Sequence, residues 1–402
     1  MRRPTKLLLT VMSAVTALSA VAVVGSTGPA AAADTSPIVV GGVWTQASYA
    51  GADAGAKAVF NQFNAAGGLN GRMIKFIGME EDDANPTTDI TAAKTLVNAG
   101  VMAVLPVMTQ AWVGGATLAK ANIPYFGWGI SAGWSGSNNG FSFIGAGQSP
   151  TVKVTSNTAY PECISFPGGN CRGKTVVLVG INNTAAITAV NDQKKEWTTL
   201  GAKVVTSLTS IPSPPATVSD FSPYVNQILA ANNGKQPDAV DTLLPPLTDV
   251  GLYQALTHAG MTGHYFAKSM YDPRVASIAK GAYVELQQAP WEQQTAAVAT
   301  MTKTVDTISP APLHSEPTEA GYISAEMFIA ALKKVGPSVT GAKLISTLNK
   351  GFSFSIPGLV EPVSFPSAHN QGQAGGAIVY GTGTGYSVTV PLLSPPKVTF
   401  PG

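Results

Sequence analysis

Charged residues are scarce in this chain of 402 residues: Asp, Glu, Lys and Arg make up 11% of it, and the net charge is +2. This balance leaves neither a basic stripe nor an acidic tail, which excludes nucleic acid as a partner. No phosphate-binding loop, dinucleotide fingerprint, zinc-protease motif or nucleophile elbow occurs. Four histidines lie without metal-ligand spacing, at His258, His264, His314 and His369. We therefore expect no catalysis, no cofactor and no metal.

Cysteine is also rare, with only Cys163 and Cys171 in the chain. They flank a segment that contains Pro167, Gly168 and Gly169. In an oxidising compartment, a close pair around such a turn predicts a disulfide that closes a local loop. A metal site or a redox pair is the alternative, but the spacing is not C-x-x-C and no histidine is near.

A single long apolar run occurs, near the N-terminus. Three basic residues within the first six begin it, residues 7–24 are mainly apolar, and Ala31-Ala32-Ala33 offers a cleavage site. This layout predicts a signal peptide over residues 1–33, cleaved near Ala33, and a secreted or periplasmic mature chain. An uncleaved membrane anchor is the alternative, because the run is about long enough to span a bilayer. No cysteine follows the run, so a lipid anchor is not supported.

Residues 34–402 exceed what one hydrophobic core usually serves, so we expect two domains. Short β-branched runs alternate with longer amphipathic stretches, which is typical of parallel sheets with crossover helices. A first series predicts strands at 38–43, 73–78, 102–106 and 125–127, with helices at 51–66, 86–99 and 114–121. A second series predicts strands at 174–180, 203–208, 239–244 and 265–267, with helices at 185–200, 224–231 and 252–259. Two such α/β lobes leave a crevice at the carboxyl ends of their strands.

Several segments resemble a known family. The segment NAAGGLNGR at 64–72, followed by a predicted strand and DDANP at 82–86, is similar to the opening of type I periplasmic binding proteins. It resembles in particular the branched-chain amino acid and amide binding group of ABC importers. The likeness continues through QPDAV at 236–240, AGY at 320–322 and VSF at 363–365.

This resemblance implies an α/β fold of two similar Rossmann-like lobes with parallel sheets, joined by three crossover strands. The crossovers are expected near Phe141 to Gln148, Gly281 to Gln288 and Pro357 to Phe365. The N-terminal lobe would then comprise residues 37–145 and 289–356. The C-terminal lobe would comprise residues 146–288 and 357–402.

The resemblance also places ligand contacts in the loops at strand ends. The hydroxyl cluster that commonly holds an amino acid's carboxylate is reduced here to Met108-Thr109-Gln110, and an aromatic contact of the second lobe is missing. Asp272 is the nearest match to the acidic residue that pairs with a ligand's ammonium, although it is also placed to begin a helix beside Pro273. The candidate ligand-binding residues are Trp44, Gln46, Met108, Thr109, Gln110, Trp112, Trp128, Gly129, Ser131, Asn183, Thr184, Thr248, Tyr271 and Asp272.

Tryptophan is unusually placed in the first series. Trp44, Trp112, Trp128 and Trp134 all fall on or just after predicted strand ends. We expect at least two of them to line the cleft, where their rings offer flat apolar area; core packing is the alternative. The ligand is then expected to be bulkier and more apolar or aromatic than a branched-chain amino acid, with at most one anionic group. The acidic run Glu80–Asp83 is interpreted as a solvated turn.

The resemblance implies a monomeric extracytoplasmic solute-binding protein that captures a small molecule and delivers it to an ABC importer permease. Ligand binding is expected to close the lobes about their crossovers. A sensor module of the same fold and a secreted hydrolase are the alternatives.

Overall fold

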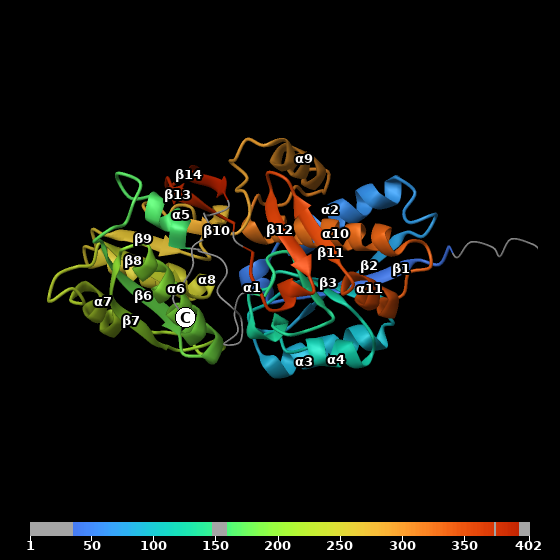
Figure 1. Cartoon of the computed structure of the whole chain (residues 1–402), viewed down its shortest axis with the longest axis horizontal. Helices are drawn as coiled ribbons and strands as arrows, with labels where there is room; N and C mark the ends of the chain where they lie inside the picture. The colour runs from blue at the N-terminus through green and yellow to red at the C-terminus, as the bar shows by residue number, and fades with distance from the viewer. Residues whose placement is uncertain (1–34, 147–158, 374, 394–402) are drawn as a thin grey trace, which may run out of the picture. The chain divides into compact units, whose positions relative to one another are not determined.

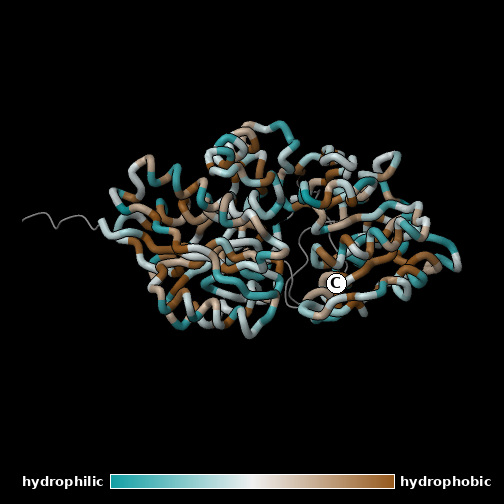
Figure 2. Tube along the Cα trace, turned by 180° about the vertical axis from the view of Figure 1, so that it is seen from behind, coloured by the Kyte–Doolittle hydropathy of each residue, from teal (hydrophilic) through white to brown (hydrophobic). Residues whose placement is uncertain are grey.

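A computed structural model describes residues 35–146, 159–373 and 375–393. The predicted signal peptide, residues 1–33, lies outside the described residues. Two large sheets with helices around them and a small two-stranded sheet form the described chain (Figure 1), which confirms the predicted α/β class. Hydrophobic stretches run through the middle of both lobes in Figure 2. Among the described residues, every helix is too short or too polar to span a bilayer.

The first sheet has five strands in the order β2-β1-β3-β4-β5, and all its pairings are parallel. Its central strand β3 is buried along its whole length, as expected for a strand covered by helices on both faces. The predicted strands of the first series are confirmed. The strands are β1 (Ile38–Trp44), β2 (Ile74–Glu81), β3 (Ala103–Met108), β4 (Tyr125–Gly127) and β5 (Gly140–Ser142).

The second sheet has seven strands in the order β14-β13-β10-β9-β8-β6-β7. Its first five strands in chain order run parallel, while β13 and β14 add an antiparallel edge. The strands are β6 (Thr175–Ile181), β7 (Lys203–Ile211), β8 (Ala239–Leu243), β9 (His264–Ala267), β10 (Tyr283–Leu286), β13 (Gly376–Gly381) and β14 (Tyr386–Leu393).

Helices accompany both sheets, and several of them begin at side-chain caps. The Asn85 side chain accepts from the Thr87 amide before α3, and Asn183 accepts from Ala186 before α6. The first sheet is accompanied by α1 (Gln46–Tyr49), α2 (Ala52–Ala65), α3 (Pro86–Asn98), α4 (Gly115–Lys120), α9 (Ala296–Val305), α10 (Glu316–Val335) and α11 (Gly341–Leu348). The second is accompanied by α5 (Ala159–Ile164), α6 (Thr184–Thr199), α7 (Ser222–Leu229) and α8 (Pro246–His258). Single 3₁₀ turns lie at Ala132–Trp134, Pro273–Val275 and Ser367–His369.

The disulfide between Cys163 and Cys171 is formed, with the two Cα atoms 4.8 Å apart. It joins the end of α5 to the segment that leads into β6. Both cysteines are buried beside Phe166, Trp197 and Phe266. The predicted local loop closure is therefore confirmed.

The third predicted crossover, Pro357–Phe365, is placed differently. It runs largely as β12 (Val360–Phe365), which pairs antiparallel with β11 (Phe352–Ile356). Phe365 packs edge-on against Phe141, with ring centroids 5.0 Å apart, and Ala368 belongs to the same first-lobe core. The leucine, valine, phenylalanine and alanine side chains of residues 359–368 are buried in the first-lobe core. Residues 357–370 therefore pack with the first lobe and not, as predicted, with the second. The chain reaches the second sheet only at β13.

Two glycines allow α2 and α10 to touch backbone to backbone. A Cβ on Gly55 would lie 1.9 Å from the Thr318 carbonyl oxygen, and one on Gly321 would lie 1.9 Å from the Ala52 carbonyl oxygen. Neither helix can yield easily, because both lie in the first-lobe core. This contact fixes the N-terminal turn of α10, which carries Glu316.

Gly321→Ala is therefore expected to lower the free energy of unfolding by about 1–3 kcal/mol through overpacking. On an exposed helix the same change would raise stability by about 1 kcal/mol, because alanine favours helix. Chemical denaturation of the variant measures the difference. Gly385→Ala is the control, since a Cβ there meets nothing within 4 Å. Equal stability of both variants would contradict this account of the helix contact.

Candidate functional site

A cavity of about 430 Å³ is lined by residues of both lobes. From the first sheet it receives the loops after β1, β3, β4 and β5. From the second it receives the loops after β6, β8, β9 and β10. Carboxyl ends of parallel strands meet at one edge of a sheet, and this edge is where open α/β proteins bind ligands.

Most of the cavity wall is apolar. Aliphatic side chains from both lobes supply it, together with the rings of Tyr49, Trp128 and Tyr271. The aliphatic residues are Ala47, Ile130, Ile144, Ile181, Ala185, Ala186, Ala189, Leu243, Leu244, Leu247, Val250 and Val275. A cavity of this size and character suits a small molecule with an apolar body.

Half of the fourteen candidate residues line the cavity. They are Gln110, Trp128, Gly129, Ser131, Asn183, Tyr271 and Asp272. Trp128 is held by its indole Nε1, which donates to Gln287 Oε1 at 2.8 Å, and by an edge contact with the Tyr49 ring at 6.1 Å. The Tyr271 hydroxyl donates to Glu292 Oε2 at 2.5 Å and accepts from the Trp291 amide at 2.8 Å. Both rings are thus fixed in the wall by polar contacts.

The other three strand-end tryptophans lie outside the cavity. Trp112 and Trp134 are 1% exposed and both pack against Tyr125, with ring centroids 4.9 Å and 4.7 Å from that of Tyr125. Trp44 packs against the first-lobe core. The expectation that at least two of the four line the cleft is therefore not met. A strand-end position does not determine whether a side chain points to the loops or back into the core.

The remaining candidates also lie away from the cavity. Met108 is a buried core residue. Thr109 is buried and donates to Asp82, which also accepts from Thr45 at 2.6 Å. Asp82 therefore anchors two loops within the protein, which corrects the interpretation of its acidic run as wholly solvated. Gln46 and Thr184 are exposed, and Thr248 is half-buried on α8.

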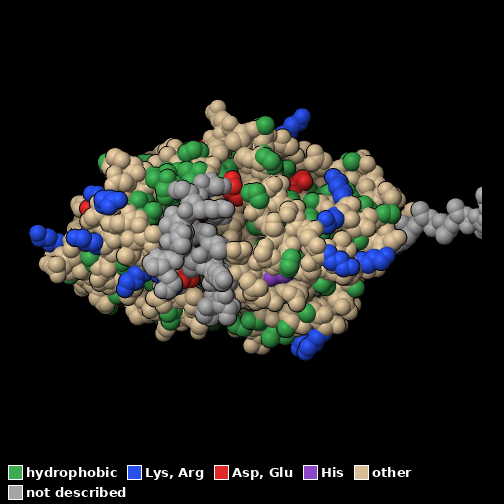
Figure 3. Space-filling view, in the orientation of Figure 1, with side chains coloured by type: hydrophobic (Ala, Val, Ile, Leu, Met, Phe, Trp, Pro, Cys, Tyr) green, Lys and Arg blue, Asp and Glu red, His purple; other side chains and the backbone are tan. Residues whose placement is uncertain are grey.

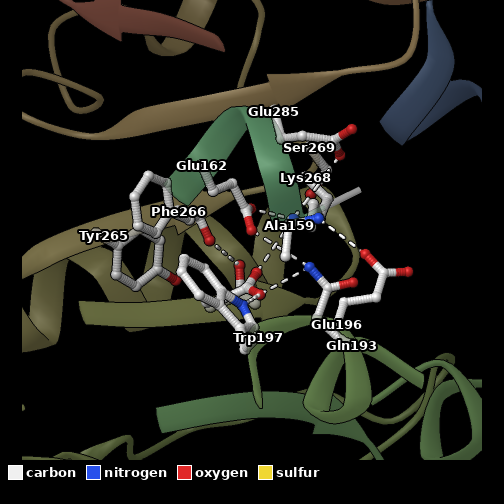
Figure 4. A network of polar contacts seen from close by, with 12 residues as sticks. Ala159, Glu162, Gln193, Glu196, Trp197, Tyr265, Phe266, Lys268, Ser269 and Glu285 are labelled. Carbon is white, nitrogen blue, oxygen red and sulfur yellow. Dashed lines mark hydrogen bonds and ion pairs between the residues drawn. The ribbon is translucent and has the colours of Figure 1, made fainter. Parts of the chain in front are cut away.

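A charged cluster that the sequence did not predict lies beside the cavity in the second lobe (Figure 4). The Lys268 ammonium contacts Glu162, lies 3.1 Å from Asp241 Oδ1 and lies 3.8 Å from Glu285 Oε2. All three carboxylates are buried, and Lys268 and Glu285 border the cavity. Asp241 also accepts from Gln193 Nε2 at 2.9 Å and from Trp197 Nε1 at 2.7 Å.

Two sequence signals pointed to this cluster. Lys268 directly follows the buried strand β9, so its side chain starts at a strand end. Asp241 interrupts the hydrophobic strand β8, where a charged residue must find a partner. The partners themselves were not predictable from spacing, because Glu162 lies 106 positions from Lys268.

A second charged pair lies beside the cavity. Arg274 donates to Asp272 through Nε at 3.0 and 3.1 Å and through Nη2 at 2.6 Å. Asp272 also caps its own turn by accepting from the Arg274 amide at 2.8 Å. The aspartate proposed as a partner for a ligand's ammonium is thus already neutralised by its neighbour.

A family model described as "Periplasmic binding protein" matches residues 40–385, nearly all of the described chain. The chain belongs to the periplasmic binding protein family. A search of the curated proteins gives no match.

Solved structures share the fold of this periplasmic binding protein at low sequence identity. A solute-binding protein of an ABC transporter from R. palustris, in complex with benzoate, is 17% identical, with a TM-score of 0.68 over 90% of this chain and 99% of that chain. A fatty acid ABC transporter substrate-binding protein from Thermomonospora curvata is 17% identical, with a TM-score of 0.70 over 90% and 95%. A branched-chain amino acid binding protein from Streptococcus pneumoniae, in complex with isoleucine, is 16% identical, with a TM-score of 0.68 over 89% and 100%.

Burial dominates the electrostatics of the cluster in this periplasmic binding protein. It raises the pKa of Glu285 to about 7, although the Lys268 ammonium opposes the rise. Burial and the neighbouring Asp241 raise the pKa of Glu162 well above its usual range, again against Lys268. Burial alone would lower the pKa of Lys268, but Asp241, Glu162 and Glu285 outweigh burial and raise the pKa above its usual value. The lysine therefore stays charged, and the surplus acids tend to hold protons.

Stability should consequently depend on pH through Glu285. The folded state binds the Glu285 proton more tightly than the unfolded state, so the stabilisation from this one group is full below its ordinary pKa of 4.5 and is lost as pH rises through its folded pKa of about 7. The displacement corresponds to up to about 3 kcal/mol.

Denaturant titrations between about pH 5 and pH 8 measure this slope. Glu285→Gln is expected to make the slope shallower, leaving the part due to Asp89, whose pKa burial also raises to about 7. Glu80→Gln, outside the cluster, should leave the slope unchanged. An identical slope in wild type and Glu285→Gln would contradict the assignment.

Proposed function

We propose that this chain is an extracytoplasmic solute-binding protein that captures a small molecule in the cavity between its lobes and delivers it to the permease of an ABC importer. The single observation that carries the proposal is that loops from eight parallel strands, four in each sheet, line one cavity. A ligand held by both lobes favours their closed arrangement, since closure adds contacts. Membership of the periplasmic binding protein family supports this role.

The cavity chemistry supports binding over catalysis. No histidine is among the described residues that line it. Ser269 donates to the Leu244 carbonyl at 2.8 Å and to Asp249 at 3.1 Å, so its hydroxyl is committed to the fold. A nucleophilic serine needs a base within hydrogen-bond reach, and Ser131 has no hydrogen-bond partner among the described residues.

The face drawn in Figure 3 supports a small-molecule partner. Lysine and arginine side chains are scattered on it and form no continuous stripe. This distribution gives no footprint for nucleic acid on that face. The chain is proposed to act as a monomer, secreted or periplasmic.

The ligand is proposed to be an apolar or aromatic molecule and not a branched-chain amino acid. This ligand class is supported by the aliphatic wall together with Tyr49, Trp128 and Tyr271. Of the four tryptophans that first suggested it, only Trp128 lines the cavity among the described residues. Burying an apolar body against this wall contributes about 25 cal/mol per Å². Two of the similar structures named above support an apolar or aromatic ligand, since one is a complex with benzoate and another is described as a fatty acid transporter's substrate-binding protein.

A thermal-shift screen of amino acids, aromatic compounds and aliphatic compounds tests the proposal, because a ligand of the folded state raises the melting temperature. Leucine, isoleucine and valine are expected to give no shift. Trp128→Ala should weaken binding of any hit at least about tenfold, since losing one buried aromatic side chain costs more than about 1.4 kcal/mol. Trp44→Phe, outside the cavity, is the control and should bind as wild type does.

Micromolar binding of leucine that Trp128→Ala leaves intact would contradict the proposed ligand class. The alternative role is that of a ligand-sensing module with the same fold, which would bind the ligand without delivering it to a permease. Reconstitution with permease and ATPase components separates the two, because only a transport protein stimulates ATP hydrolysis when the ligand is bound.

A further inference from the structure

The charged groups that line the cavity are mostly acidic. Of the residues that the structure describes, five carboxylates and two cations border it, the cations being Lys268 and Arg274. The carboxylates belong to Asp192, Glu196, Asp272, Glu285 and Glu316. Among the described residues, the cavity therefore carries more negative than positive groups.

Both cations are already engaged by the protein. Lys268 contacts three buried carboxylates, and its side chain is only 14% exposed. Arg274 donates to both carboxylate oxygens of Asp272, through Nε and Nη2. A carboxylate on the ligand would find no unpaired cation among the described residues of this wall, and burying an uncompensated charge is costly.

The carboxylates differ in what they contact. Asp192 pairs with Lys195 at 3.1 Å, and Glu196 accepts from the Ala159 amide at 2.9 Å. Glu285 Oε1 is buried without a hydrogen-bond partner among the described residues. Within the described residues, the Glu316 carboxylate accepts one hydrogen bond, from the neutral amide of Gln288 to Oε1 at 3.2 Å. Glu285 and Glu316 are thus the carboxylates with unmet acceptor capacity.

Glu316 lies where several elements converge. It is the first residue of α10, it is 4% exposed, and it borders the cavity. The titratable groups coupled to it are all acids: Tyr49 of α1, Asp272 after β9, Glu285 of β10, Glu319 one turn along α10 and Tyr386 of β14. No base among the described residues offsets this group, so a cation delivered by a ligand would stabilise the charged form of Glu316, which burial and the neighbouring acids otherwise disfavour.

We propose that the ligand carries a protonated amine and no carboxylate on its apolar body, and that Glu316 binds the amine. This inference rests on the proposed function. The rings of Tyr49, Trp128 and Tyr271 border the same cavity and offer faces that attract a cation. Burial raises the pKa of Glu316 well above its usual range, so the free protein holds a proton there and an arriving ammonium displaces it.

Calorimetry with matched compounds tests the charge preference on the wild-type chain. The first set is 3-phenylpropylamine, 3-phenylpropan-1-ol and 3-phenylpropanoate, which share one ring and one chain length. Two further sets carry the same three head groups on an octyl chain and on an adamantyl group. They ensure that a negative result does not come only from a phenylpropyl group that is too large or too small for the cavity. In at least one set, the amine is expected to bind tenfold or more tightly than the alcohol, with release of a proton, and the carboxylate is expected to give no measurable binding.

Variants assign the effect to Glu316. Glu316→Gln keeps an acceptor oxygen but removes the charge, so amine affinity should fall at least tenfold while alcohol affinity stays within threefold. Asp192→Asn is the matched control, a cavity carboxylate already paired with Lys195, and should change neither by more than threefold. Retained alcohol binding shows that the variant is folded.

Three results overturn the inference: a carboxylate that binds as tightly as its amine, amines that fail on all three bodies, or Glu316→Gln weakening alcohol and amine equally. If acids or alcohols still bind in these cases, the proposed solute-binding function stands and only the amine assignment falls. If no compound of any charge binds here or in the thermal-shift screen, the proposed function falls as well.

Discussion

The carboxyl ends of the parallel strands in both sheets carry their loops to one cavity, and the rest of the account depends on this placement. It follows from the chain's alternation of buried strands with amphipathic helices, which forces each crossover to return the chain in the same direction. The loops after β1, β3, β4 and β5 thus face the cavity together with those after β6, β8, β9 and β10. Neither lobe alone supplies the lining, so binding and the relation between lobes are coupled.

Buried charge decides what the cavity accepts. Lys268 and Arg274 are the cations of the described lining, and the fold engages both with its own carboxylates. Such clusters add little to stability but are costly to leave incomplete, because each charge has lost its water. Lys268 and Arg274 are therefore not available to pair with an anionic ligand. Glu316, held by the glycine-mediated contact of α10 with α2, is left facing neutral and acidic groups.

Sequence patterns predicted the strands, the helices, the disulfide and the family, because each depends on residues close together in the chain. They predicted only half of the candidate site. Trp112 and Trp134 sit at strand ends yet turn inward onto Tyr125, and periodicity within a loop does not encode that choice. The Lys268 cluster joins α5, β8, β9 and β10, so it exists only once the second sheet has formed.

Nuclear magnetic resonance of isoleucine methyl groups tests the central claim most directly. Ile130 and Ile144 reach the cavity from the first lobe, and Ile181 reaches it from the second, whereas Ile38 and Ile228 are buried elsewhere in the two cores. With a compound that raises the melting temperature, the account predicts that Ile130, Ile144 and Ile181 shift together along one saturation curve while Ile38 and Ile228 stay nearly fixed. Shifts confined to one lobe, or largest at Ile38 or Ile228, would contradict a binding site shared by both lobes.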